Sequence, residues 1–169
     1  DDALEAFGPL DGLILDVRLN GGGSSSVVDP IFKLFVDGTL GKFVSRNDSR
    51  ALQVKADPIH NSQTVPIIVI VSEDTVSYGE IFAGVLKDLG RAKVVGQTSL
   101  GNVEVLHGYN FDDNSQVWIA SETFYSATSE TNFELSGIIP DVEAFAEWDT
   151  ITFETDPSIK AALGLLGHQ

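Results

Sequence analysis

The chain has 169 residues and no cysteine, and its 25 acidic against 10 basic side chains give a net charge of −15 at pH 7. That length fits one domain with a core of its own, and the charge argues against nucleic acid or an anionic membrane surface as a partner. The lack of cysteine excludes disulfides and thiolate metal sites, and no apolar stretch reaches the ~20 residues of a membrane-spanning helix.

The first β-loop-α unit follows an acidic, helix-compatible segment at residues 1–7. Residues 12–17 are a short apolar run typical of a buried strand, and glycines at 21–23 mark the loop after it. Apolar residues at helical spacing predict a helix over 26–36. Because the chain opens so directly into a buried strand, we expect residues 1–169 to be a single domain from the C-terminal part of a longer chain, with an N-terminal segment missing.

The middle of the chain repeats this pattern of strand, turn and helix. Residues 42–45 and 52–54 predict two strands around a polar turn, with no clear sign that either is buried. The apolar run 66–71 predicts a buried strand, and the apolar stripe over 77–89 predicts a helix directly after a tight turn. Residues 93–96 predict another short strand.

The last third of the chain changes character. Residues 103–109 and 116–124 flank the turn cluster 112–115, which predicts a hairpin, and residues 159–166 predict a final helix. Strands interleaved with helices indicate an α/β domain with a mixed sheet.

Ser77 is placed at the sharp junction between the buried strand and the next helix. Negative charge that develops there would meet free N–H groups and the positive end of the helix dipole. Serine is also a common helix N-cap, and Ser77 with Glu80 fits a capping box. One position can fill both roles, so the motif permits a nucleophile without requiring one.

The glycines at 21–23 follow the first strand in the same way. Consecutive glycines let backbone N–H groups approach an oxyanion closely, although they are also compatible with an ordinary flexible turn. Two such turns in one sheet can converge at one edge. We therefore expect the N–H of Tyr78 and that of Gly21 or Gly22 to form an oxyanion hole beside Ser77.

Four sequence blocks resemble the C-terminal processing (tail-specific) serine peptidases. They are LILDVRLNGGG at 13–23, VSEDTVSYGEIFAGVLKDLGRA at 71–92, GQTSLG at 96–101 and GIIPD at 137–141. The resemblance implies a crotonase/Clp-like core of ββα units, hydrolysis of peptide bonds in extended polypeptide by Ser77, and no metal or cofactor. It also favours an extracytoplasmic or secreted location and is compatible with a homo-oligomer.

Position 102 departs from the classical members of that family. They place a general-base lysine there, 25 residues after the serine (102 − 77), and this chain has Asn102. A serine hydroxyl needs an adjacent base to become a useful nucleophile, and an asparagine cannot accept its proton. The tricorn-core branch, which this chain resembles more closely, uses a histidine oriented by a glutamate three residues before the GIIPD-type signature. That position is Glu134, and the resemblance implies that the histidine comes from an upstream segment.

Two other interpretations stay open. An α/β-hydrolase esterase fragment would use the order Ser77, Asp141 and His168 as a triad. A catalytically inactive, peptidase-like binding module would keep the groove after losing its base, as Asn102 permits. The two remaining histidines, His60 in a polar loop and His107 in an expected strand, carry no motif of their own.

Overall fold

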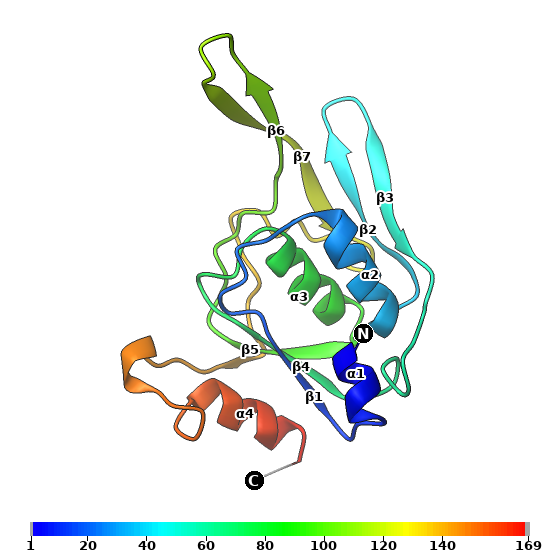
Figure 1. The fold of residues 1–169 in the computed structure, drawn as a ribbon, viewed down its shortest axis with the longest axis vertical. Helices are drawn as coiled ribbons and strands as arrows, with labels where there is room; N and C mark the ends of the chain where they lie inside the picture. The colour runs from blue at the N-terminus through cyan, green and yellow to red at the C-terminus, as the bar shows by residue number, and fades with distance from the viewer. Residues whose placement is uncertain (1, 168–169) are drawn as a thin grey trace.

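The computed structural model describes residues 2–167, and its strands form two four-stranded sheets (Figure 1). The first sheet is parallel, in the order β1-β4-β5-β8. Its strands are β1 (Leu13–Asp16), β4 (Ile67–Val71), β5 (Ala92–Gly96) and β8 (Val142–Glu143). All five residues of β4 are buried, as its unbroken apolar sequence predicts for a strand covered on both faces.

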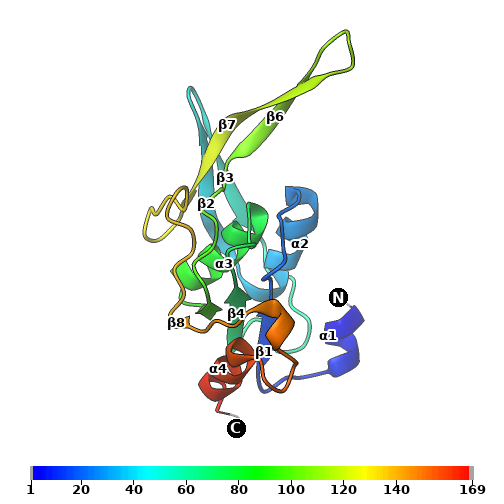
Figure 2. The same ribbon diagram turned by 90° about the vertical axis from the view of Figure 1, so that its left-hand side faces the viewer.

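The second sheet is antiparallel, in the order β3-β2-β7-β6. Its strands are β2 (Gly38–Ser45), β3 (Ser49–Val54), β6 (Val105–Asn110) and β7 (Gln116–Ser126). The outer part of β6 and β7 extends away from the body as an arm (Figures 1 and 2). β6 lies at one edge of this sheet, so its outer backbone groups have no neighbouring strand.

Two helices lie between the sheets, α2 (Ser25–Phe35) and α3 (Tyr78–Asp88), and they pack against each other (Figure 1). The last helix, α4 (Pro157–Leu165), covers the other face of the parallel sheet. The short α1 (Asp2–Phe7) and the 3-10 turn η1 (Trp148–Thr150) complete the described elements. None of the helices within residues 2–167 has the length and apolar character that crossing a membrane requires.

The core has two parts because β4 alternates its side chains between the two faces of the parallel sheet. Ile68 and Ile70 pack toward α4, while Val69 and Val71 belong to the larger core shared with α2, α3 and the antiparallel sheet. This arrangement places the carboxyl ends of β1 and β4, with the loops that follow them, beside the start of α3.

The predicted α/β class is confirmed, and the structure separates its parallel and antiparallel strands into two sheets. The predicted strands and helices are present with shifts of a few residues at their ends. The strands β2 and β3, whose burial the sequence pattern left in doubt, contribute Leu40, Phe43, Leu52 and Val54 to the core. Their inner faces are covered because the antiparallel sheet packs over α2 and α3.

Candidate active site

Ser77 has the most unusual backbone at the end of the parallel sheet. It immediately precedes α3 and has φ +58° and ψ −123°, a combination that residues with a side chain rarely adopt. An ordinary N-cap residue has an extended backbone, so helix capping alone does not account for this conformation. Strain of this kind costs about 1–3 kcal/mol and is concentrated at functional sites.

The conformation of Ser77 is held by the buried carboxylate of Glu80, whose exposed fraction is 0%. Glu80 accepts hydrogen bonds from the backbone N–H of Ser77 at 3.0 Å, of Gly101 at 2.6 Å and of Asn102 at 2.9 Å, and from Ser99 Oγ at 2.6 Å. The N–H of Ser77 also donates to the Asn102 carbonyl at 2.9 Å. One carboxylate therefore fastens the turn after β5 to the turn that carries Ser77.

The glycine loop lies directly against Ser77. Gly22 has φ +103°, and a Cβ placed on it would lie 2.7 Å from Ser77 Cβ and 3.1 Å from Ser77 Oγ. Asn20 holds the loop in place, because its carbonyl accepts from Val76 N–H at 2.9 Å and its Oδ1 accepts from Gly22 N–H at 2.9 Å. A Cβ on Gly79 would come within 2.8 Å of the Asn20 carbonyl oxygen, so only glycine allows α3 to approach the loop this closely.

The three backbone donors expected for an oxyanion hole differ in availability. No acceptor within residues 2–167 pairs with the N–H of Tyr78, at the start of α3, or with that of Gly21. The N–H of Gly22 is already engaged by the side chain of Asn20. The free donors next to Ser77 are therefore those of Tyr78 and Gly21.

The side chain of Tyr78 is buried beside the carboxyl of Asp29 and the guanidinium of Arg50. Burial raises its pKa, and the nearby carboxyl of Asp29 raises it further. Neither the Tyr78 hydroxyl nor Asp29 Oδ1 has a hydrogen-bond partner within the described chain. Arg50 lies alongside, paired with Glu122 at 2.7 Å and stacked 4.0 Å above the ring centroid of Phe43. This packing anchors the residue whose backbone N–H faces the site.

Ser77 opens into a cleft of about 520 Å³. Its walls come from the glycine loop, the start of α3, the turn after β5 and the base of the arm. The lining residues are Gly21, Gly23, Ser24, Ser25, Arg50, Val76, Ser77, Tyr78, Ile81, Asn102, Val103, Glu104, Val105, Leu106 and Trp118. The cleft is therefore partly apolar and contains one basic and one acidic side chain.

Asn102 lines one wall of this cleft, and Glu134 binds the backbone of the residue that follows it. The exposed Asn102 lines the cleft beside Ser77, and the next residue, Val103, donates its N–H to Glu134 Oε2 at 2.9 Å. Glu134 is half-buried. Burial raises its pKa, opposed by the Val103 hydrogen bond and reinforced by the negative charge of Glu104 and Glu80. The structure thus places Glu134 next to the segment that contacts Ser77, although the two are 57 residues apart (134 − 77).

The other candidates from the sequence lie elsewhere. His60 is 3.4 Å from Glu5, and His107 packs against the ring of Tyr109, and neither side chain lines the cleft. Asp141 accepts from Val94 N–H and pairs with Lys87 at 3.1 Å. His168 lies outside the described residues. Within residues 2–167, no three histidine, cysteine or carboxylate side chains gather as a metal site requires.

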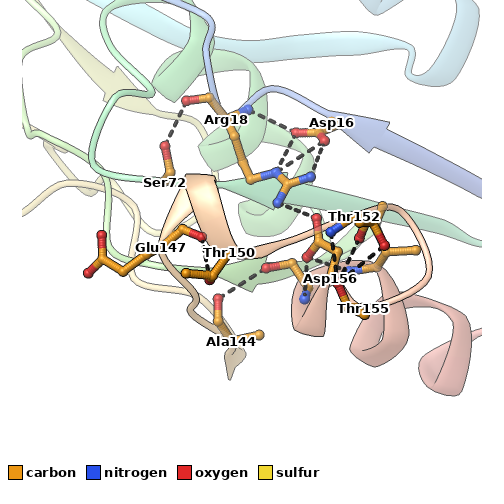
Figure 3. A network of polar contacts seen from close by, with 11 residues as sticks. Asp16, Arg18, Ser72, Ala144, Glu147, Thr150, Thr152, Thr155 and Asp156 are labelled. Carbon is orange, nitrogen blue, oxygen red and sulfur yellow. Dashed lines mark hydrogen bonds and ion pairs between the residues drawn. The ribbon is translucent and has the colours of Figure 1, made fainter.

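Behind the glycine loop, Arg18 joins the site to the C-terminal segment (Figure 3). Its guanidinium binds both oxygens of Asp16, at 2.6 to 3.1 Å, and binds Asp156 at 2.6 Å. Asp156 also caps α4 by accepting from the N–H groups of the helix's first turn. The carbonyl of Arg18 accepts from Ser72 Oγ at 2.7 Å. The guanidinium and the carbonyl of Arg18 therefore both hold the residues that lead into the glycine loop.

Several of these residues were not singled out from the sequence as parts of the site. Arg50 and Glu104 line the cleft, but an arginine in a hairpin and a lone glutamate have no pattern that marks them. Glu80 was recognisable only as a capping residue. Its three additional hydrogen bonds come from a turn 19 to 22 residues away.

Comparison with known proteins identifies a family for this chain. Residues 1–144 match the sequence model of Peptidase family S41. A Staphylococcus aureus protein described as "Probable CtpA-like serine protease" is 27% identical over 174 residues, covering 93% of this chain and 35% of the relative. The chloroplastic C-terminal processing peptidase of Tetradesmus obliquus is 29% identical over 134 residues, covering 78% and 28%.

Among solved structures, the photosystem II D1 C-terminal processing protease superimposes with a TM-score of 0.72 and 26% identity, over 92% of this chain and 39% of that one. The chain thus spans about a third of the length of the curated relatives it matches. The family match extends over the glycine loop, the Ser77 turn, the turn at Asn102 and the Glu134 loop. This chain belongs to peptidase family S41, as its four sequence blocks predict.

Proposed function

We propose that the protein containing this chain is a serine peptidase that cleaves extended polypeptide, with Ser77 as the nucleophile. The observation that carries the proposal is the strained Ser77, which sits at the N-terminus of α3 with its hydroxyl against Gly22. The peptidase relatives and the matched family support the same reaction class.

In this proposal, Ser77 Oγ attacks the scissile carbonyl and the resulting oxyanion accepts from the N–H groups of Tyr78 and Gly21. Each such donor contributes about 3 kcal/mol in the transition state. The positive end of the α3 dipole adds to the stabilisation. Gly22 serves as the close-packed neighbour of Ser77, since its own N–H is bound by Asn20.

Within residues 2–167, no histidine or lysine lines the cleft as a base for Ser77. Asn102 has no group that accepts the proton of Ser77, and neither His60 nor His107 lines the cleft. We assign the role to a histidine from another segment of the full-length protein, oriented by Glu134 as in the tricorn-core branch. The ionised Glu134 would hold the imidazole in one tautomer and stabilise the imidazolium that forms as Ser77 loses its proton.

The substrate would bind as an added strand along β6. This strand is at the edge of its sheet, and its first two residues, Val105 and Leu106, line the cleft. Main-chain hydrogen bonds to an edge strand tolerate varied side chains. Sequence preference close to the scissile bond should therefore be broad, and folded proteins should be poor substrates.

The test uses the full-length protein and denatured casein. Ser77→Ala should abolish cleavage and Glu134→Gln should lower kcat by orders of magnitude, whereas Asn102→Ala should change the chemical step little. A fluorophosphonate probe should label the unaltered protein and not Ser77→Ala. A large loss of kcat in Asn102→Ala would instead indicate that position 102 takes part in the chemistry.

The binding-module alternative is favoured by one observation, the exposed Asn102 at the position of the family's base. It predicts that the unaltered protein and Ser77→Ala both bind denatured casein and that neither cleaves it. Absence of fluorophosphonate labelling together with retained binding would establish that alternative.

A further inference from the structure

A second hollow lies on the other side of the glycine loop from the Ser77 cleft. It has a volume of about 680 Å³ and is lined by Asp16, Arg18, Leu19, Asn20, Gly21, Gly22 and Trp148. Gly21 lines both the hollow and the cleft, and Gly22 lies between the hollow and Ser77. A polypeptide that crosses the Ser77 cleft can therefore continue over Gly21 into the hollow.

The charges around this hollow are already paired. Arg18 binds Asp16 and Asp156, and the Arg18 and Asp156 side chains are only 11% and 5% exposed. Because both carboxylates already bind the Arg18 guanidinium, it is not free to attract an anionic side chain of a substrate. By contrast, the side chains of Leu19 and Trp148 are 72% and 48% exposed. Leu19 and Trp148 thus offer exposed apolar surface in the hollow, beside the Asp16 side chain, which is 41% exposed.

Trp148 is held in position before any ligand arrives. Its ring lies 4.8 Å from Arg18 Cζ, a distance at which a guanidinium stacks favourably on an indole. The 3-10 turn η1 begins at Trp148, and Figure 3 shows the ion pairs of Arg18 with Asp16 and Asp156. An aromatic wall fixed in this way loses little conformational entropy when it binds a side chain.

We propose that Leu19, Gly21 and Trp148 form a substrate pocket, called here the Trp148 subsite, that takes a large apolar side chain of the polypeptide. This inference rests on the proposed peptidase function. An extended chain places alternate side chains on one face, so the residue in the pocket should lie at one fixed position relative to the scissile bond.

The Trp148 subsite gives this protein a preference of its own. Leu19 and Gly21 belong to residues 1–144, which match the family, whereas Trp148 follows them. One wall is therefore part of the shared core and the other comes from the segment between β8 and α4. The broad preference expected along β6 then coexists with one selective position on the far side of the glycine loop.

The experiment maps the cleavage sites of the full-length protein in denatured casein by mass spectrometry. Leu, Ile, Phe, Tyr or Trp should be enriched at one fixed position relative to the cuts. In a synthetic peptide copied from one site, replacing that residue by glycine should lower kcat/KM about tenfold or more. In Trp148→Ala, the enrichment should disappear and the two peptides should be cleaved at similar rates.

Phe153→Ala is the matched control, because Phe153 is 72% exposed on the same segment and does not line the hollow; it should keep the enrichment. If Trp148→Ala cleaves the glycine peptide at the rate of the unaltered enzyme, the variant is folded. A second variant, Leu19→Ser, should weaken the same preference for a large apolar residue. Unchanged enrichment in Trp148→Ala, or cuts with no fixed apolar position, would refute the subsite alone. A protein that cleaves no casein refutes the peptidase function as well.

Discussion

Replacing Gly22 by alanine would perturb the contact between the glycine loop and the nucleophile. The added Cβ would lie 2.7 Å from Ser77 Cβ, where an ordinary contact is at least 3.4 Å. The two residues must therefore separate by about 0.7 Å (3.4 − 2.7), and Val76 O, at 3.3 Å, blocks one direction of relief. The substitution also places a side chain at φ +103°, which carries a cost of its own.

Two magnitudes follow from this geometry. The left-handed backbone should lower the free energy of unfolding by about 1–3 kcal/mol. A displacement of about 1 Å in a catalytic group can lower the rate by ~100-fold, so kcat/KM of Gly22→Ala should fall by roughly two orders of magnitude. Most of the loss should be in kcat, because the cleft walls that bind the substrate remain in place.

The chain offers a matched control in Gly38. It has a similar φ of +97°, but an added Cβ would meet nothing within 4 Å, and it lies at the start of β2. Urea unfolding and casein hydrolysis should be measured on both variants of the full-length protein. Gly38→Ala should lose a similar amount of stability and keep its activity.

Equal activity of Gly22→Ala and the unaltered protein would refute the reasoning, because it would mean that the loop does not position Ser77. Equal loss of activity in both variants would attribute the effect to backbone strain in general. Only a loss confined to Gly22→Ala supports contact with the nucleophile.

Three further predictions concern the carboxylates. Glu80→Gln places an amide among N–H donors, so it should lower the free energy of unfolding measured in urea melts by at least about 2 kcal/mol. The control Glu73→Gln, at an exposed position, should change that free energy by less than about 0.5 kcal/mol. Asp156→Asn keeps the cap of α4 but removes the ion pair with Arg18, so it should lower the free energy of unfolding by roughly 1–3 kcal/mol. An unchanged Tm in thermal melts would show that this ion pair does not stabilise the fold. Because burial raises the pKa of Glu134, its ionisation opposes folding as pH rises through the raised pKa. The unaltered protein should therefore lose stability relative to Glu134→Gln as pH rises from the ordinary glutamate pKa toward the raised one, and parallel pH profiles of the two proteins would contradict this.

Much of the local structure was predictable because it depends on neighbouring residues. The apolar run of β4 and the apolar stripe of α3 each identify a secondary-structure element from a short stretch of consecutive residues. The glycines at 21–23 and the serine at the strand-to-helix junction mark the two turns of the site for the same reason. Four blocks in order identified the family, because they preserve the spacing between these turns.

The pairing of the strands could not be predicted in the same way. Alternation shows which face of a strand is buried but does not name its neighbour. The separation into a parallel and an antiparallel sheet, with β2 beside β7, depends on contacts between residues about 80 positions apart, such as Gly41 and Ser126. The burial of β2 and β3 follows from that pairing and has no local signal.

The residues of the site also fall into those that the local sequence indicates and those that only the packing brings together. The sequence by itself determined that Ser77 stands at the start of a helix, that glycines follow β1 and that position 102 lacks a base. Only the tertiary structure decided that Glu80 binds the turn at Asn102 and that Trp148 lies across from Gly22, 126 residues away (148 − 22). Turn chemistry is set by adjacent residues, whereas the neighbours of a side chain across a cleft are set by how the sheets and helices pack.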